Sequence, residues 1–581
     1  MTDGAREAAI LGIDLGTTEV KVGLVTVDGR LLALARAGYR TDADPETGRA
    51  EQDPEAWWGA LTTAVRFIVT NGRAEVLAIA VDGHGPTLVA VDDGGRPTRP
   101  AIIWQDSRAT GEQAELAEAT GLEGWSLAGL PAALWVERNE PDVAARTRWY
   151  LATWDFVALR LTGRAATSLA DGQPLPSATV LAAVGIPAER MAEPTPAGAR
   201  IGELSPAAAQ QLGLRSGIPV VGGVVDAWAS FHGAGMTRAG DAIDVGGAAG
   251  GFGVYWDQPI KVEGSFVTIA PLPGLYSIGG AMAATGRALD WFRTEIVGTT
   301  ESTEALLEEA AATPPGAGGV LFLPYLAGER SPIWDPSARG AFAGLSLGHR
   351  RGHLARAILE ASALALRHVA EPIVTAGIAV REMRVCGGPA RSEAWNQIKA
   401  DVTGFSVEVP EILETAVLGA AILGATGIGA YPDVPSAIHG MTHVSRRLEP
   451  RAELRDLYDT AYDAYTRLHP AIAPIVRALA PTTPHPATEG AARFQSPATR
   501  PAIARTFASW PRSPSSRPSH SRHVTPGRSR RVRAGLRRRL PPAVPIPRSR
   551  SACRPRPNRW IPRSSTSRPA NRSCSRSSTR C

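Results

Sequence analysis

Short apolar runs alternate with polar turns and with longer helical patterns along most of this chain. Residues 8–39 contain three apolar runs, and the Asp28-Gly29 pair between the second and third is typical of a β-hairpin. The spacing of apolar residues predicts a helix over 54–70, and 75–81 reads as a further strand. The first part of the chain is therefore a strand-rich α/β segment.

A second cycle of the same kind opens near Ile218. Strands are predicted around Val220 and in the segments DAIDVGG (241–247), GVYW (253–256) and LYSIGGA (275–281), and a short strand is predicted over 383–387. Helices are predicted over 303–312, 351–377, 391–403 and 451–479. Two such cycles predict an α/β fold of two related lobes around a central cleft. We expect the N-terminal lobe to span 8–236 and the C-terminal lobe 237–479.

The pattern stops at about residue 480. The segment 480–581 is rich in Arg, Ser and Pro and has no apolar periodicity, which predicts a disordered tail. One reading of this segment is a basic arm that binds nucleic acid or anionic lipid, and a second reading is an additional domain. We favour a third, out-of-frame translation past a complete domain, because 92 residues from Gly490 onward contain no Asp, Glu or Lys.

Charge separates the tail from the body. The net charge of +6 arises because the last 92 residues hold 23 arginines, whereas residues 1–489 hold 56 acidic and 39 basic side chains. An acidic body argues against a nucleic-acid groove, so no nucleic-acid partner is expected. Cys386 is the only cysteine before the tail, which fits a reducing compartment.

No membrane or secretory segment is expected from the sequence. The opening residues MTDGAREAAI lack the basic and apolar regions of a signal peptide. The uncharged, apolar-leaning run from Thr415 to Tyr431 has 17 residues dominated by Ala and Gly and predicts a buried helix rather than a membrane span. We therefore expect a cytoplasmic protein.

Three stretches carry candidate chemistry, and the first is GIDLGTTEVKVG, residues 12–23. Asp14 ends an apolar strand and Gly16-Thr17-Thr18 follows in a tight turn, which offers backbone N–H groups and two hydroxyls to phosphate. Asp14 could hold Mg²⁺ or its water, and Lys21 could neutralise charge. A β-hairpin with a polar turn explains the same residues without chemistry.

The other two stretches are VVGGVVDAWASFHGAG, residues 220–235, and VCGGPARSEAWNQIKADVTG, residues 385–404. In the first, Asp226 at a strand end suits a general base, although an aspartate that caps the following helix is the simpler reading. In the second, Gly387-Gly388 between a strand and a helix has the arrangement of a nucleotide-binding turn.

The order and spacing of these motifs resemble those of the FGGY carbohydrate kinases, the sugar-kinase branch of the actin-like ATPases. The segment GAFAGLSLGHRRGHLARAILE, residues 340–360, fits the C-terminal signature of that family at every defined position. LPYLAGERSPIWDPSARG (323–340) and AIIWQDSRA (101–109) resemble the preceding segment and the sugar-side loop. The likeness covers Ile10 to Leu479 and implies a ribonuclease-H-like fold in both lobes, which close over ATP and a sugar or polyol.

The resemblance also assigns residues to roles by position. Asp226 matches the catalytic base, which takes the proton from the sugar hydroxyl that attacks the γ-phosphate, and Asp14 matches the acid near Mg²⁺ and the phosphates. The nucleotide-binding matches are Gly16, Thr17, Thr18, Gly246, Gly247, Gly286, Gly387 and Gly388. The sugar-binding matches, besides Asp226, are His84, Trp104, Asp106 and Arg108, on patterns of xylulokinase-like members. A ketopentose such as xylulose is the implied substrate, and a homodimer is one expectation because relatives are often dimers.

Two departures from the family pattern affect function. Asp82-Gly83-His84 lacks the Gln and Met of the usual pattern, so the wall of the sugar pocket differs. At the second phosphate loop, relatives commonly have Gly-Thr-Ser where this chain has Gly247-Ala248-Ala249, and a lost hydrogen bond to a charged group is worth about 1.5–3 kcal/mol. The alternative to an active kinase is therefore a sugar-binding protein with weakened or absent phosphotransfer.

Overall fold

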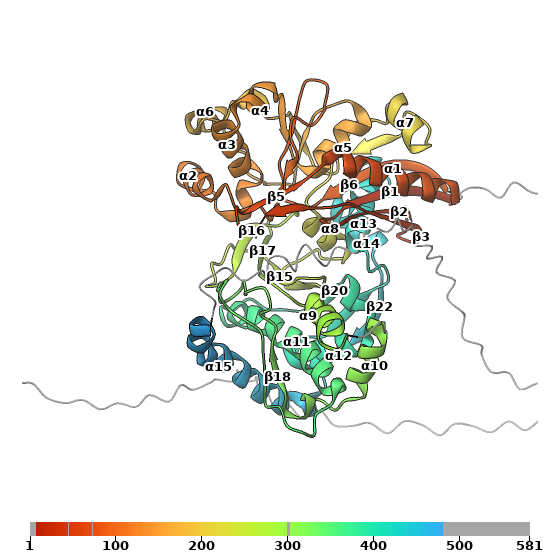
Figure 1. Ribbon diagram of the computed structural model, residues 1–581. Helices are drawn as coiled ribbons and strands as arrows, with labels where there is room; N and C mark the ends of the chain where they lie inside the picture. The colour runs from red at the N-terminus through yellow and green to blue at the C-terminus, as the bar shows by residue number, and fades with distance from the viewer. Residues whose placement is uncertain (1–6, 45, 72–73, 299–301, 480–581) are drawn as a thin grey trace, which may run out of the picture. The chain divides into compact units, whose positions relative to one another are not determined.

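Two β-sheets with matching strand order form the framework of the molecule. The computed structural model describes residues 7–44, 46–71, 74–298 and 302–479. The first sheet has the order β12-β13-β6-β1-β2-β3 and the second β16-β17-β15-β14-β20-β21-β22 (Figure 1). In the first sheet, β1, β2 and β3 pair antiparallel, and β6 and β13 continue the sheet parallel to β1. In the second sheet, β14, β15 and β17 pair antiparallel in the same way, and β20 and β21 continue it parallel to β14. This duplicated arrangement confirms the α/β fold of two related lobes.

The strands of the first sheet are β1 (Glu7–Leu15), β2 (Glu19–Thr26), β3 (Leu31–Gly38), β6 (Ala74–Gly83), β12 (Arg200–Glu203) and β13 (Pro219–Val221). Those of the second are β14 (Asp241–Val245), β15 (Gly250–Trp256), β16 (Phe266–Ile269), β17 (Tyr276–Met282), β20 (Glu382–Cys386), β21 (Val407–Pro410) and β22 (Val444–Leu448). The predicted boundary between 236 and 237 falls between these two sets. The exact lobe limits, 8–236 and 237–479, stay a prediction.

Both faces of the first sheet are covered, which explains why β1 is apolar from Ala8 to Ile13. Alternate residues of a strand point to opposite faces. In β1, Leu11 and Ile13 belong to the core that contains α1 (Pro54–Asn71), whereas Ile10 packs in a separate core with Val417 of α13 (Thr415–Gly427). The helix on this second face thus comes from the C-terminal part of the chain.

Small residues let α13 approach the first sheet and α8 (Asp226–Gly233) at backbone distance. A Cβ atom added to Gly12 of β1 would lie 2.4 Å from the carbonyl oxygen of Val417. One added to Gly419 would lie 1.9 Å from the carbonyl oxygen of Ala229 in α8. The buried helix predicted in the apolar run at 415–431 is therefore α13, which ends at Gly427. Within the described part of the chain, no helix combines the length and apolar character that crossing a membrane requires.

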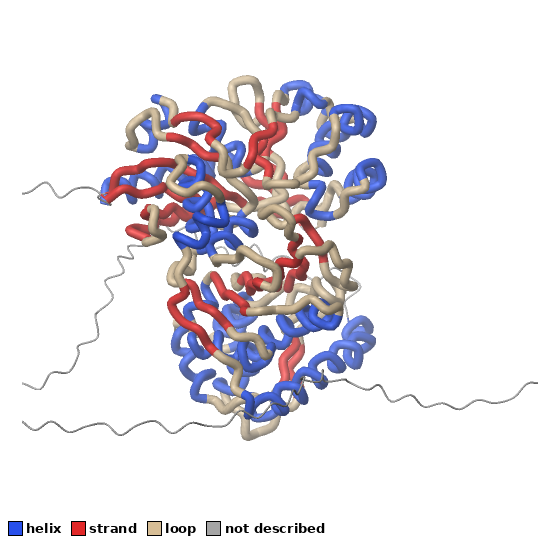
Figure 2. Tube along the Cα trace, turned by 180° about the vertical axis from the view of Figure 1, so that it is seen from behind, coloured by secondary structure: helices blue, strands red, loops and turns tan. Residues whose placement is uncertain are grey.

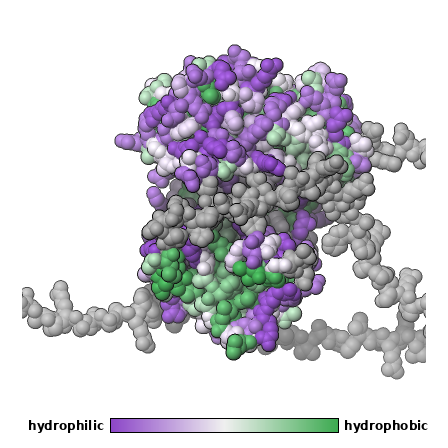
Figure 3. All heavy atoms as spheres, viewed as in Figure 1, coloured by the Kyte–Doolittle hydropathy of each residue, from purple (hydrophilic) through white to green (hydrophobic). Residues whose placement is uncertain are grey.

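The second lobe contains helices that lie between the strands of the second sheet or after them in the sequence. They are α9 (Gly286–Trp291), α10 (Thr303–Ala312), α11 (Arg351–Thr375), α12 (Glu393–Thr403) and α15 (Arg455–Leu479). Figure 2 shows helices beside the strands in both halves from the opposite side. At the end of α15, Ile475 and Leu479 are exposed, and hydrophobic surface is visible in Figure 3 over the part of the molecule that carries α15.

The predicted helix limits differ from the observed ones by a few residues. The helix expected over 351–377 ends at Thr375, since Gly377 adopts a φ of 92°. The helix expected from 451 begins at Arg455, after a 3₁₀ turn at Ala452–Leu454. The predicted tail, residues 480–581, lies outside the described residues.

Candidate functional site

Carboxylates from three elements meet at one edge of the first sheet. Asp14 and Asp82 lie opposite each other in the parallel pairing of β1 with β6, close to where both strands end. Asp14 is 3% exposed, and Lys21 of β2 donates to its Oδ2 over 3.0 Å. Asp226 opens α8 after β13, the next parallel strand in the sheet. The two aspartates that sequence motifs singled out therefore lie at the same edge, as parallel strands require.

Asp82 is a site residue that the sequence motifs missed. Its side chain is fully buried, and neither carboxyl oxygen has a hydrogen-bond partner among the described residues. Burial first, and then the charges of Asp14 and Asp226, raise its pKa well above the usual range. The available signal was its position at the end of an apolar strand parallel to the one that delivers Asp14.

Asp226 is the first residue of α8 rather than its cap. The N-cap position belongs to Val225, which makes no side-chain cap bond, and the Oδ1 of Asp226 accepts from the N–H of Ala227 over 2.7 Å. Desolvation and the charge of Asp14 raise the pKa of Asp226 to about 7. Such a group accepts a proton efficiently near neutral pH.

The first predicted phosphate loop is a tight turn between β1 and β2. The N–H of Gly16 donates to the carbonyl of Glu19 over 3.1 Å, and the hydroxyl of Tyr39 donates to the carbonyl of Gly16. The indole Nε1 of Trp104 donates to Oγ1 of Thr17 over 3.0 Å, which leaves the hydroxyl hydrogen of Thr17 available to a ligand. Thr18 is exposed. Trp104, predicted to contact sugar, thus touches the phosphate loop directly.

His84 presents one unpaired ring nitrogen. Its Nδ1 lies 3.0 Å from Oγ1 of Thr87, while its Nε2 is buried without a partner among the described residues. Burial lowers the pKa of His84 to about 3, so the ring is neutral at physiological pH. A neutral imidazole can donate to, or accept from, a sugar hydroxyl at this nitrogen.

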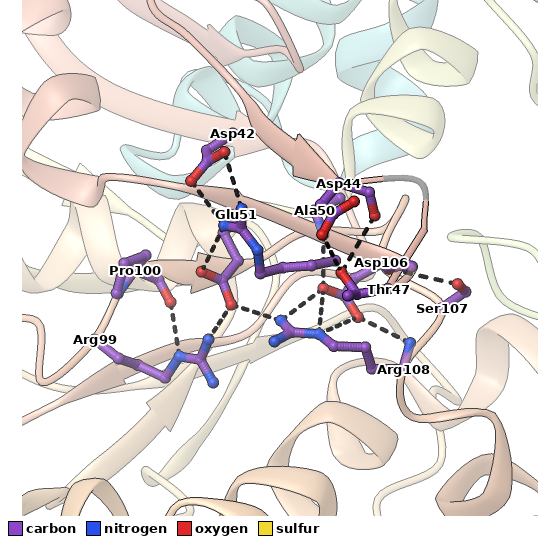
Figure 4. A network of polar contacts seen from close by, with 12 residues as sticks. Asp42, Asp44, Thr47, Ala50, Glu51, Arg99, Pro100, Asp106, Ser107 and Arg108 are labelled. Carbon is purple, nitrogen blue, oxygen red and sulfur yellow. Dashed lines mark hydrogen bonds and ion pairs between the residues drawn. The ribbon is translucent and has the colours of Figure 1, made fainter. Parts of the chain in front are cut away.

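Asp106 and Arg108, by contrast, are occupied by protein partners. Figure 4 shows the network: Asp106 accepts from the backbone N–H of Ala50 over 2.8 Å and from the Arg108 guanidinium over 2.7 Å. Arg108 also donates to Glu51 over 2.5 Å and lies 4.4 Å from the ring centre of Trp135. The Asp106 side chain is 2% exposed. The structure thus gives these two residues a role in fixing the loop that carries Trp104.

Three of the predicted nucleotide-binding glycines, Gly247, Gly286 and Gly388, line a cavity of about 660 Å³ in the second lobe. Gly246 and Gly387 are their chain neighbours, whereas Gly16 lies in the turn between β1 and β2. A Cβ on Gly286 would be 2.4 Å from the Gly247 carbonyl oxygen, and one on Gly387 would be 1.9 Å from that of Gly246. Backbone segments that touch at these distances require glycine. The cavity is also lined by residues to which sequence motifs assigned no role. They include Asp290 of α9, Glu304 and Glu308 of α10, Trp395 of α12 and Arg391 of a short 3₁₀ turn.

The second predicted phosphate loop is the turn of the hairpin between β14 and β15. Its Gly247 N–H donates to the carbonyl of Ala249 over 2.9 Å. The carbonyls of Gly247 and Ala248 accept three N–H bonds from residues 285–287 at the start of α9. Ala248 is exposed and lines the cavity.

Glu414 connects the lining of this cavity to the carboxylates at the edge of the first sheet. It pairs with Arg391 over 3.0 Å, with Lys21 over 3.5 Å and with Arg36. Burial alone would raise the pKa of Glu414, but the three cations outweigh it and lower that pKa. Lys21 is thus shared between Glu414 and Asp14.

Comparisons with known proteins agree with this geometry. The model of the FGGY family of carbohydrate kinases, N-terminal domain, matches residues 9–233, and that of the C-terminal domain matches residues 245–428. The xylulose kinase of Bacillus subtilis (strain 168) is 30% identical over 486 residues, 79% of this chain and 96% of that protein. The gluconokinase of the same organism is 28% identical over 482 residues, 76% and 93% of the two chains. A crystal structure described as a xyloylose kinase from Brucella ovis has a TM-score of 0.70 at 30% identity and covers 80% of this chain and 99% of that one.

Proposed function

Because this chain belongs to the FGGY family of carbohydrate kinases and is a sugar kinase, we propose that it transfers the γ-phosphate of ATP to a hydroxyl of a ketopentose such as xylulose. The observation that carries this proposal is the meeting of Asp14, Asp82 and Asp226 at one sheet edge, with the pKa of Asp226 raised to about 7. A base with that pKa is half ionised at neutral pH and gains a proton readily as the reaction proceeds.

Asp226 takes the proton from the attacking sugar hydroxyl. The hydroxyl oxygen then forms its bond to the γ-phosphorus while the bond to the β-phosphate oxygen breaks, so that ADP leaves and the proton stays on Asp226. Phosphoryl transfer depends on position and charge neutralisation more than on covalent chemistry by the protein. Lys21, whose pKa Asp14 and Glu414 raise against the effect of burial, supplies a fixed positive charge at this edge.

The residues of the sheet edge fit a divalent cation. Asp14 offers a carboxylate that Lys21 already orients, and Asp82 offers two oxygens without a partner among the described residues. Carboxylates of this kind are the ligands that Mg²⁺ prefers, usually together with phosphate oxygens. Mg²⁺ held by Asp14 would neutralise charge that develops on the phosphates. ATP-dependent chemistry of this type also suits the cytoplasm, where we place the protein.

The absence of hydroxyls at Ala248 and Ala249 is compatible with activity. Neither alanine N–H has a hydrogen-bond partner in the described part of the chain, and Ala248 lines the nucleotide-side cavity. Successive free backbone N–H groups in a turn bind anions without any side chain. We therefore favour an active kinase over a sugar-binding protein without phosphotransfer.

The sugar side favours an uncharged polyol over a sugar acid. A carboxylate such as that of gluconate needs a cation, and Arg108 already balances Asp106 and Glu51. His84 remains neutral and offers a single hydrogen-bonding nitrogen. This reasoning favours an uncharged sugar or polyol over gluconate among the substrates that the names of the relatives suggest.

The test is ADP release by the full-length protein with ATP and Mg²⁺ on xylulose, ribulose, gluconate and glycerol. We expect turnover on a ketopentose to exceed that on gluconate. Asp142→Asn, which changes an exposed acid of α4 (Pro141–Arg146), is the matched control for Asp226→Asn. A preference for gluconate would refute the substrate class, and equal rates for wild type and Asp226→Asn would refute the site.

A further inference from the structure

The turn Gly247-Ala248-Ala249 is held from its carbonyl side by the start of α9. The carbonyl of Gly247 accepts from the N–H of Gly286 over 3.0 Å. The carbonyl of Ala248 accepts from the N–H groups of Thr285 and Arg287 over 3.1 and 3.0 Å. The N–H groups of Thr285, Gly286 and Arg287, at the start of this six-residue helix, therefore all donate to the loop and are not free to bind a ligand.

The side chain of Thr285 adds a fourth bond to the same turn. A threonine at the N-cap of a helix ordinarily accepts from an N–H group of the first helical turn. Thr285 occupies the N-cap of α9 but makes no such bond. Its Oγ1 instead donates to the carbonyl of Gly247 over 3.3 Å, and the residue is 6% exposed.

Thr285 also packs against the far end of the loop. A Cβ atom on Gly250, the first residue of β15, would lie 2.7 Å from Cγ2 of Thr285 and 3.0 Å from its Oγ1. The loop therefore fits closely around this one side chain, which contacts it where it leaves β14 and where it enters β15. A residue without the hydroxyl keeps the packing and loses the hydrogen bond.

The opposite side of the turn carries the groups that can bind a ligand. The N–H groups of Ala248 and Ala249 have no partner among the described residues, and Ala248 borders the cavity. Leu289 and Asp290 of α9 border the same cavity. A nucleotide in this cavity thus contacts α9 and the loop that α9 holds.

We propose that Thr285 is a positioning residue for the polyphosphate of the nucleotide, a role that rests on the proposed kinase function. Its hydroxyl fixes the Gly247 carbonyl and so aims the N–H groups of Ala248 and Ala249 at phosphate. A loop without side-chain hydroxyls depends on such fixation, because its only donors are backbone groups whose direction is set by the turn itself.

The experiment compares binding of a non-hydrolysable ATP analogue and of AMP to the full-length protein by calorimetry. Thr285→Val removes the hydroxyl, Thr285→Ser keeps it, and Thr460→Val is the matched control, since the exposed Thr460 donates its hydroxyl to the Asp456 carbonyl of its own helix, α15. Loss of one hydrogen bond predicts that Thr285→Val binds the ATP analogue about 3- to 10-fold more weakly. AMP, which lacks the β- and γ-phosphates, should bind unchanged, and Thr285→Ser should resemble wild type.

The outcomes separate this inference from the proposed function. If wild type binds the ATP analogue and Thr285→Val binds it equally well, the positioning role is refuted. Equal weakening for AMP and the ATP analogue would also refute it, because it would indicate a general structural defect. If wild type binds no nucleotide, the kinase proposal itself fails. Should Thr285→Val not fold, as judged by thermal unfolding, Thr285→Ala provides the same comparison.

Discussion

Asp226 illustrates how the surroundings of one carboxyl change its pKa. The sequence places an acid after an apolar strand, which also describes a helix cap. The structure puts the cap at Val225 and leaves Asp226 in a desolvated position near Asp14, which raises its pKa to about 7. The sequence could not show that Asp82 lies beside Asp14 with both carboxyl oxygens unpaired among the described residues, because this depends on the pairing of β1 with β6.

The raised pKa of Asp226 predicts a specific dependence of activity on pH. The base acts in its ionised form, so kcat/KM of wild type should fall about tenfold per pH unit below pH 7. Asp226→Asn should reduce kcat by about 100- to 10,000-fold and remove this dependence. Initial rates between pH 5.5 and 8.5 under saturating ATP check both statements. A wild-type profile that is flat over this range would contradict the role of Asp226.

Ionisation of the Asp226 carboxyl should destabilise the folded protein. The pKa is about 7 in the folded protein and about 3.9 in the unfolded chain. Between these values the folded protein holds a proton that the unfolded chain releases, so wild type loses stability as pH rises from 4 to 7. Asp226→Asn lacks this loss, and its Tm should exceed that of wild type at pH 8 but not at pH 4. Equal Tm differences at both pH values would contradict the assignment.

At the scale of elements, periodicity predicted the first three strands, α1, β6 and the main strands and long helices of the second lobe, but none of the helices and short strands between residues 84 and 217. It could not predict the partners of loop residues, which depend on chain segments far apart. Asp106 and Arg108 are two residues apart in sequence, but Glu51, which completes their network, comes from β5 (Arg49–Gln52). Their predicted contact with sugar stays a prediction, since both are engaged with protein groups.

The Arg108 network makes a prediction that separates structural support from sugar contact. Arg108→Met leaves the buried Asp106 and Glu51 carboxylates without this cation, which should reduce the free energy of unfolding by about 3 kcal/mol in urea titrations. Arg138→Met is the matched control, because the Arg138–Glu115 pair is exposed and should contribute under about 1 kcal/mol. If Arg108→Met unfolds like wild type but raises the KM for sugar, Arg108 contacts the substrate directly.

At the scale of the whole molecule, two features tie the halves of the chain together. Helix α13 packs its glycines against β1 and α8, and Glu414, the residue before it, pairs with Lys21 and Arg36 from the first sheet and with Arg391 beside the cavity. A chain of charges therefore runs from the nucleotide side through Glu414 and Lys21 to Asp14. The buried helix was predictable from its composition, whereas the convergence of three distant cations on one carboxylate was not.

Glu414→Gln tests this connection. The cations lower the pKa of Glu414 despite its burial, so its ionised form stabilises the folded protein at pH values above the unfolded pKa of about 4.3. That stabilisation disappears as pH falls through the lower folded pKa. At pH 7 the variant should lose about 2 kcal/mol of unfolding free energy, and the difference from wild type should shrink only as pH falls below about 4.3. Glu449→Gln, at an exposed carboxylate paired with Arg447, should change little at pH 7 or at pH 3. A difference for Glu414→Gln that stays constant from pH 7 to pH 3 would show that the side chain acts by shape rather than by charge, and the electrostatic link between the halves would have to be abandoned.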